Sequence, residues 1–134
     1  MKKIKVLFVA LSAMTSLVAL SSCGGDSKQA EDVAKDFLSS YFATDYQAAA
    51  SCCTEELSEA LLDAVEEYYS FEENVRKDVV DISSSVVTTI TSIKVQSKDS
   101  ILVKYDMVLP DSDRPIENVL TIVQVEGDWR VAKF

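Results

Sequence analysis

The residues best suited to chemistry in this 134-residue chain are three cysteines, and the chain has no histidine. Two of the cysteines, Cys52 and Cys53, are adjacent, and no pair has CxxC spacing. The common zinc and redox sites are therefore not predicted. Because the Cα atoms of neighbouring residues are about 3.8 Å apart, below the usual disulfide range of about 4.4 to 6.8 Å, we expect two thiols. The alternative is a strained vicinal disulfide.

Acidic side chains are the other groups that could hold a metal ion. They gather in residues 66–81 and in residues 111–113. The first group consists of Glu66, Glu67, Glu72, Glu73, Asp78 and Asp81. Neither group has the alternating ligands and the turn glycine of a calcium loop. We therefore expect these charges to be solvated, and we predict no metal and no cofactor.

The N-terminus has the order of a secretory signal. Lys2, Lys3 and Lys5 precede an uncharged stretch, whose apolar part is shorter than the roughly 20 residues of a membrane-spanning helix. The stretch ends in Leu20-Ser21-Ser22-Cys23-Gly24-Gly25, which resembles the bacterial lipobox. Only the cysteine thiolate of such a motif is nucleophilic enough to accept a diacylglyceryl group, and two or more acyl chains anchor a protein stably.

This pattern predicts three regions. Residues 1–22 would be a cleaved signal peptide, residues 23–28 a tether that begins at the lipidated Cys23, and residues 29–134 a single domain. The protein would be held at a membrane of the bacterial cell envelope through this lipid. An ordinary secreted protein or a core helix would each explain only part of the pattern.

The charge of the predicted mature chain excludes one class of partner. All 22 acidic residues follow the signal, and three of the 13 basic residues lie within it, so the mature net charge is 10 − 22, or about −12. Nucleic acid binding requires a basic surface, and we therefore predict no nucleic acid partner.

The periodicity of the apolar residues predicts helices first and strands afterwards. Helical spacing covers residues 30–42, with Ser27 or Asp26 as the expected N-cap, and residues 46–53 and 54–68, with Thr54 as an N-cap of the last. Residues 71–82 are interpreted as a helix end plus linker. Strands are predicted at residues 83–95, 101–109, 116–125 and 128–134, the last two joined by a hairpin turn at Glu126-Gly127. This order predicts an α+β domain with N-terminal helices packed on an antiparallel sheet.

Three short segments also suggest a family. Asp45-Tyr46-Gln47-Ala48-Ala49, Cys53-Thr54-Glu55-Glu56 and Gly127-Asp128-Trp129-Arg130-Val131 resemble the lipoprotein branch of the nuclear-transport-factor-two-like (cystatin-like, lumazine-binding-like) superfamily. The resemblance implies a curved, cone-shaped sheet around the helices with a cavity at its open end. Some members of this superfamily are enzymes and many bind small molecules or proteins, so the fold does not transfer an activity.

Five apolar or aromatic residues are candidates for the lining of such a cavity: Phe37, Tyr41, Tyr105, Met107 and Trp129. The alternative is that they form the core of a small domain. Isomerases of this fold use an acid beside a tyrosine, but Asp106 alternates with Tyr105 along a strand and should point to the opposite face.

We therefore predict a non-catalytic module for a small apolar ligand. The alternatives are an interaction module for another protein or for a second copy, and, least favoured, an isomerase-like enzyme.

Overall fold

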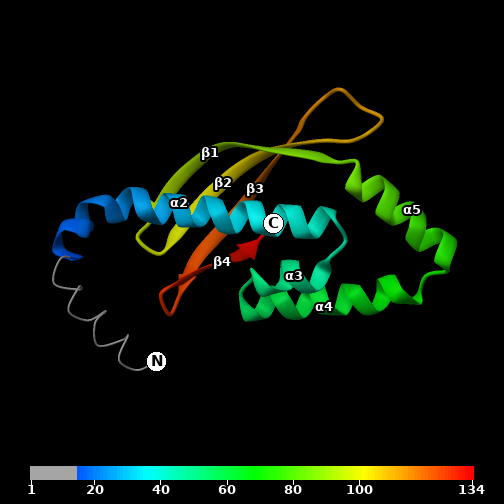
Figure 1. Cartoon of the computed structure of the whole chain (residues 1–134), viewed down its shortest axis with the longest axis horizontal. Coiled ribbons are helices and arrows are strands. Elements are labelled where there is room, and N and C mark those ends of the chain that lie inside the picture. The colour runs from blue at the N-terminus through cyan, green and yellow to red at the C-terminus, as the bar shows by residue number, and fades with distance from the viewer. Residues whose placement is uncertain (1–14) are drawn as a thin grey trace.

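The computed structural model describes the backbone of residues 15–134 and the side chains from Gly25 onward. In this part of the chain, helices precede strands (Figure 1). The helices are α2 (Thr15–Phe42), α3 (Tyr46–Ser51), α4 (Glu55–Ser70) and α5 (Glu73–Ser84). The strands are β1 (Val87–Ser97), β2 (Ser100–Val108), β3 (Ile116–Val125) and β4 (Asp128–Lys133). The α+β class predicted from the sequence is confirmed.

Most of the predicted signal peptide, residues 1–22, lies outside the residues that the structure describes. Residues 1–14 and the side chain of Cys23 lie outside the described residues, so the signal peptide and the lipidation remain predictions. Within the described part of the chain, no helix has an apolar stretch long enough to cross a bilayer.

The backbone of residues 23–28, which the sequence assigns to the tether, is part of α2, and the helix runs through it without a break. Asp26 and Ser27, predicted as helix caps, are therefore inside the helix. Two ion pairs at helical i,i+4 spacing lie in the following turns, Lys28 with Asp32 at 3.4 Å and Lys35 with Glu31 at 3.0 Å. Such pairs favour the helix by only a few tenths of a kcal/mol each.

The four strands form an antiparallel meander in the order β1-β2-β3-β4. Tyr105 pairs with Ile90 on one side and with Asn118 on the other. Along β2, Val103 and Tyr105 are buried whereas Lys104 is exposed, which is the alternation predicted from the sequence. The sheet therefore has an inner face toward the helices and an outer face. At the β3–β4 turn, Glu126 and Gly127 both have positive φ, as a tight hairpin requires.

Helix α2 lies across the inner face and contacts all four strands (Figure 1). Phe37 and Ala34 of this helix are fully buried against the sheet, where Val103 and Leu120 are also fully buried. Two small buried residues of α3, Ala49 and Ala50, let this helix approach α2 closely. The core is thus a single layer of side chains between helices and sheet.

The junction of α3 and α4 is attached to the free edge of β4. The Val131 amide donates to the Cys52 carbonyl at 2.8 Å, and the Thr54 amide donates to the Val131 carbonyl at 2.9 Å. Thr54 also caps α4, as predicted, because its hydroxyl oxygen accepts from the Leu57 amide. These contacts fix α4 beside the C-terminal strand.

Helix α5 corrects the interpretation of residues 71–82 as a helix end plus linker. Its apolar residues Val75, Val79 and Ile82 recur at helical spacing, and its charged side chains are solvated, so the charge density does not prevent a helix. The helix buries no residue fully. Its C-terminal end is joined to α2 by a hydrogen bond from the Ser83 hydroxyl to the Phe42 carbonyl at 2.9 Å.

Candidate ligand-binding cleft

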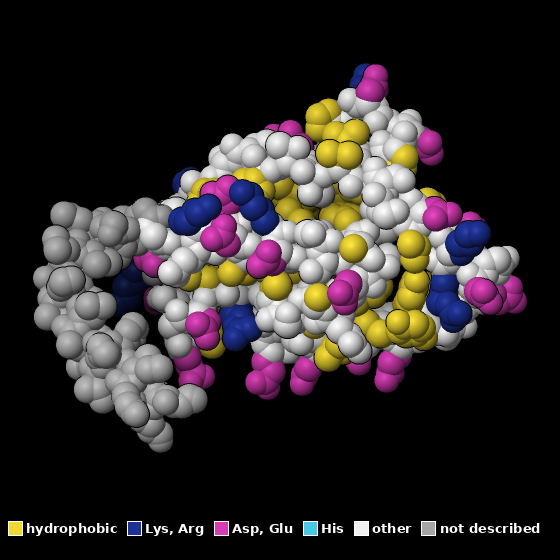
Figure 2. Space-filling model, viewed as in Figure 1, with side chains coloured by type: hydrophobic (Ala, Val, Ile, Leu, Met, Phe, Trp, Pro, Cys, Tyr) yellow, Lys and Arg dark blue, Asp and Glu magenta, His cyan; other side chains and the backbone are white. Residues whose placement is uncertain are grey.

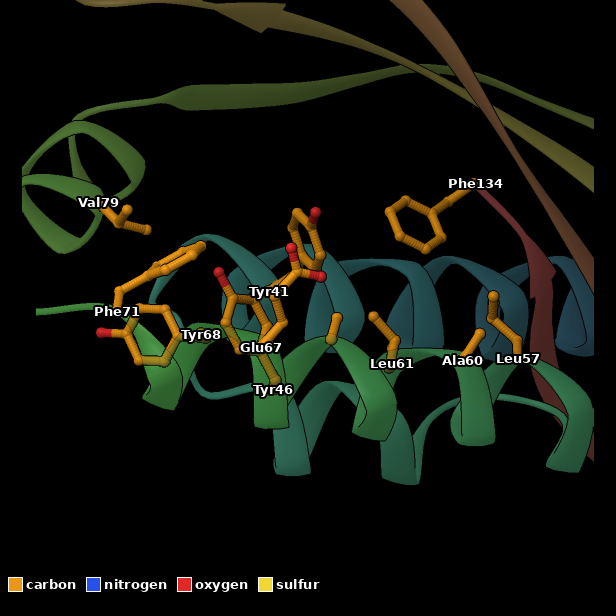
Figure 3. Close-up of a pocket in the computed structure, with 11 residues that line it drawn as sticks. Tyr41, Tyr46, Leu57, Ala60, Leu61, Glu67, Tyr68, Phe71, Val79 and Phe134 are labelled. Carbon is orange, nitrogen blue, oxygen red and sulfur yellow. The ribbon is translucent and has the colours of Figure 1, made fainter. Parts of the chain in front are cut away.

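An apolar cleft of about 380 Å³ lies between α4 and the ends of α2 and β4 (Figure 3). Most of its floor comes from one face of α4, and single side chains from α2, α3, α5 and the C-terminal residue complete it. The lining residues are Tyr41, Tyr46, Leu57, Ala60, Leu61, Ala64, Glu67, Tyr68, Phe71, Val79 and Phe134. The size is within the roughly 300–1,000 Å³ of small-molecule sites.

Aromatic rings form a continuous series along this cleft. Phe134 contacts Tyr41 with ring centroids 5.1 Å apart, Tyr41 contacts Tyr46 at 5.5 Å, and Tyr46 contacts Tyr68 at 5.7 Å. All three contacts are edge-to-face, the geometry in which the positive edge of one ring meets the negative face of the next. Phe71 extends the series beyond Tyr68, with centroids 6.5 Å apart.

The cleft has two chemically different ends. Figure 3 shows Leu57, Ala60 and Leu61 toward Phe134, and the tyrosines with Glu67 toward the other end. The Glu67 side chain rises from α4 beside Tyr46 and toward Tyr41 (Figure 3). One end therefore offers hydrocarbon and the other offers phenol rings, hydroxyl groups and a carboxylate.

Burial keeps the Tyr46 phenol at this end protonated at neutral pH. The pKa of Tyr46 is raised above its ordinary value, first by burial and then by the neighbouring Tyr41 and Tyr68. The pKa of the buried Tyr105, in the core behind the cleft, is raised by burial and by Tyr41. The Tyr46 hydroxyl, which lines the cleft, can therefore donate a hydrogen bond to a ligand, and it adds no negative charge.

Helix α5 forms the outer wall of the cleft through Val79. Arg76 joins the start of this helix to the end of α4, since its guanidinium donates to the Tyr69 and Phe71 carbonyls at 3.2 and 3.1 Å. The same guanidinium lies 5.9 Å from the centroid of the Tyr69 ring. The wall is thus attached at both ends, while none of its own residues is fully buried.

The five residues proposed from the sequence are divided among different environments. Tyr41 lines the cleft. Phe37 is fully buried in the core beneath it, with its ring 5.0 Å from that of Phe134. Tyr105 is also in the core, and Met107 packs against it from the same face of β2. Of the five residues, Tyr41 is therefore at the cleft surface. Phe37, Tyr105 and Met107 lie in or against the core behind the cleft.

The fifth, Trp129, borders a separate and more polar groove. This groove lies between α2 and the β3–β4 turn, and its lining includes Asp32, Asp36, Cys52 and Arg130. The Trp129 indole is buried, and its Nε1 has no hydrogen-bond partner within the described residues. Arg130 donates to the Ser51 carbonyl at 2.8 Å, which connects β4 to the end of α3.

Asp106 lies on the outer face of the sheet, as its alternation with Tyr105 predicts. It pairs in register with Thr89 on β1 and Glu117 on β3. Its neighbours in register are therefore a hydroxyl and another acid, while Tyr105 faces the core. The acid and phenol that an isomerase-like reaction would need on one face are on opposite faces.

Cys52 and Cys53 are both free thiols, and only Cys53 is buried. The Cys53 sulfur lies 3.2 Å from the Ala49 carbonyl, and burial, with a smaller effect of Cys52, raises its pKa to about 12. The pKa of Cys52 is raised by burial and then by Asp36, and lowered by Ser51 and Arg130. Among the described residues, no group of three or more His, Cys, Asp or Glu side chains could hold a metal ion.

Sequence reasoning missed most of the cleft. Tyr68, Phe71 and Phe134 are not among the lining residues proposed from the sequence, and neither is Glu67, whose charge is exposed as predicted. The helical spacing of residues 54–68 does predict a common face for Leu57, Leu61 and Tyr68. Nothing local in the sequence places Phe134 beside Tyr41.

Comparison with known proteins yields likenesses to solved structures but no match to a family or to a curated protein. A ketosteroid isomerase-like protein from Erwinia carotovora atroseptica is similar in structure, with a TM-score of 0.45 and 13% identity, over 80% of this chain and 91% of that chain. At this level the likeness carries no argument about activity or ligand, and the lipoprotein branch remains a prediction.

Proposed function

We propose that this protein is a membrane-anchored lipoprotein of the bacterial cell envelope whose domain binds a small, largely apolar ligand without transforming it. The observation that carries the proposal is the aromatic cleft of about 380 Å³ on α4. A cleft of this size with apolar walls and a few polar tips is typical of ligand sites.

The chemistry of the cleft favours binding over catalysis. Its lining offers three phenols and one carboxylate, and Glu67 is on an exposed face of α4. Asp106, the acid that the superfamily resemblance suggests, is separated from the cleft by the sheet. General acid–base catalysis depends on groups within hydrogen-bond reach of one reacting atom.

The proposal is tested by filling the cleft. Ala64 lines it and is exposed, so Ala64→Phe adds a ring to the cleft without disturbing the core. Leu62→Phe is the matched control, because Leu62 is exposed on the same helix and is not among the lining residues. The uncharged dye Nile red, which fluoresces in apolar surroundings, serves as the probe.

We expect saturable dye binding by the wild type and by Leu62→Phe, and a loss of about tenfold or more in affinity for Ala64→Phe. Equal binding by both variants would show that the dye occupies another surface. An absence of saturable binding by the wild type would remove the support for a small-ligand site.

The outer face of the sheet supports a second candidate function. Val119 and Val125 are about 41% exposed there, and Leu102 and Val123 are half-buried on the same face. Contact with another protein or with a second copy would cover them. Sedimentation of the wild type and of Val119→Lys would test self-association, and identical monomeric behaviour over a wide concentration range would exclude the homodimer.

A further inference from the structure

We propose that the cleft on α4 selects an amphiphilic organic cation, with an ammonium head at Tyr41, Tyr46 and Glu67 and an apolar body along Ala60 and Leu61 toward Phe134. This inference rests on the proposed function and adds the charge and orientation of the ligand. It excludes fatty acids and other anionic amphiphiles as preferred ligands.

The first argument is the chemistry of the end of the cleft that holds the tyrosines. Tyr41, Tyr46 and Tyr68 lie in consecutive contact there, at 5.5 and 5.7 Å between centroids, and all three line the cleft. The faces of phenol rings carry negative electrostatic potential, so they attract ammonium groups within about 6 Å of the centroid. Trimethylammonium groups are favoured, because they are large and weakly hydrated and have no N–H group that needs a hydrogen-bond acceptor.

The second argument is charge. Glu67 is the one ionisable lining residue other than the tyrosines, and neither lysine nor arginine is among the residues that line the cleft. Residues 55–84, which form α4 and α5, carry ten acidic and two basic side chains. Such a surface raises the local concentration of cations and repels anions. Figure 2 shows apolar side chains gathered where α4 and α5 meet, with both acidic and basic side chains around them.

One of the two basic side chains of α5 has other partners. Arg76 donates to the carbonyls of Tyr69 and Phe71 and lies over the Tyr69 ring. Its guanidinium therefore neutralises the C-terminal end of α4, where helix carbonyls lack partners. The Glu67 carboxylate has no ion pair with it within 4.0 Å, and it remains available to a ligand.

The third argument is the order of the lining along α4. Leu57, Leu61 and Glu67 span ten residues of one helix, or about 15 Å at 1.5 Å per residue. Figure 3 shows the carboxylate and the tyrosine rings at one end of this span and Leu57 with Phe134 at the other. A ligand with a charged head and a hydrocarbon body of about this length would place each part against the matching surface.

The test uses three probes with the same phenylpropyl body. The first is (3-phenylpropyl)trimethylammonium, the second is its uncharged counterpart in which carbon replaces the nitrogen, and the third is the anion 4-phenylbutanoate. Their affinities for the full-length protein in nanodiscs, at low and at high salt, are measured by displacement of Nile red. Protein variants are Glu67→Gln, its neighbour Glu66→Gln as the matched control outside the lining, and Ala64→Phe.

We expect the cation to bind about fivefold more tightly than the uncharged probe, the fold-change of a partly exposed cation–π site, and the anion to bind least. Glu67→Gln should reduce the preference for the cation about threefold, and Glu66→Gln should leave it nearly unchanged. High salt should weaken the preference. Ala64→Phe should reduce the affinity for all three probes.

Each other outcome has a distinct meaning. Equal affinity for the cation and the uncharged probe, or equal effects of Glu66→Gln and Glu67→Gln, would overturn this inference while leaving the proposed binding function intact, provided Ala64→Phe still blocks binding. Tighter binding of the anion would also overturn it. An absence of binding by all three probes would overturn both proposals.

Discussion

The two adjacent cysteines give the sharpest stability prediction, because the same substitution is made in two different environments. Cys53 is 5% exposed and belongs to the core, whereas Cys52 is half-buried at the polar groove. In Cys53→Ser the new hydroxyl enters an apolar site, which costs roughly 1–3 kcal/mol without a partner. The Ala49 carbonyl, 3.2 Å from the present sulfur, can recover roughly 0.5–1.5 kcal/mol as an acceptor.

The expected net loss is therefore about 0.5–1.5 kcal/mol for Cys53→Ser, and it is smaller for Cys52→Ser, less than about 0.5 kcal/mol. For a domain of this size, each kcal/mol corresponds to roughly 4–8 °C in Tm. Urea and thermal unfolding, followed by circular dichroism and by the fluorescence of Trp129, measure both losses. Equal losses, together with a mass two protons low in the absence of reductant, would refute the reasoning and indicate a vicinal disulfide.

The pH dependence of the same variant gives an independent measurement. The pKa of the Cys53 thiol is raised from its ordinary value of 9.0 to about 12 in the folded protein. The folded state thus retains a proton that the unfolded state releases near pH 9. This contribution to stability is complete below pH 9 and is lost as the pH rises toward 12. The unfolding free energy of the wild type should therefore fall more steeply above pH 9 than that of Cys53→Ser. If the unfolding free energies of the two proteins fall in parallel with pH, the Cys53 thiol does not contribute in this way.

Three further predictions concern the anchor, a helix cap and the cleft. Cys23→Ala should leave an uncleaved precursor that takes up no labelled fatty acid, and retained label would place the lipid elsewhere. Thr54→Ala removes the N-cap of α4 and should cost about 1 kcal/mol in urea unfolding, whereas an unchanged midpoint would show that the β4 contacts alone hold this helix. Phe134→Ala removes a ring that is 44% exposed but contacts Phe37 and Tyr41, and it should cost roughly 1–2 kcal/mol, with Lys133→Ala as a control that has little effect on Tm.

The strands were predictable because a sheet with one buried face imposes a period of two on its residues. The alternation from Ile101 to Met107 therefore located β2 to within a residue or two, and Glu126-Gly127 located the final turn. Local signals also sufficed for the start of α4, where Thr54 is an N-cap in sequence and in structure.

The start of α2 and the whole of α5 were not predictable in the same way, whereas the end of α2 at Phe42 was. Asp26 and Ser27 are of residue types that often cap helices, but an N-cap has no function where the preceding backbone is already helical. In α5 the apolar residues are few, and charged residues surround them in the sequence, so their helical spacing is a weak signal. The signal is weak because the helix buries no residue fully. Where burial is slight, the sequence carries little periodic signal.

The sequence alone determined the order of helices and strands, the N-terminal signal pattern and the absence of histidine chemistry, since these depend on residue type and on near neighbours. The tertiary structure decided which aromatic residues meet. Phe134 reaches Tyr41 because β4 is paired at the edge of the sheet, and Tyr68 reaches Tyr46 because α4 folds back along α3. Packing placed Phe37 and Tyr105 in the core and left Tyr41 at the cleft, because three aromatic residues of similar hydrophobicity differ only in the distance of each from the edge of the helix–sheet layer.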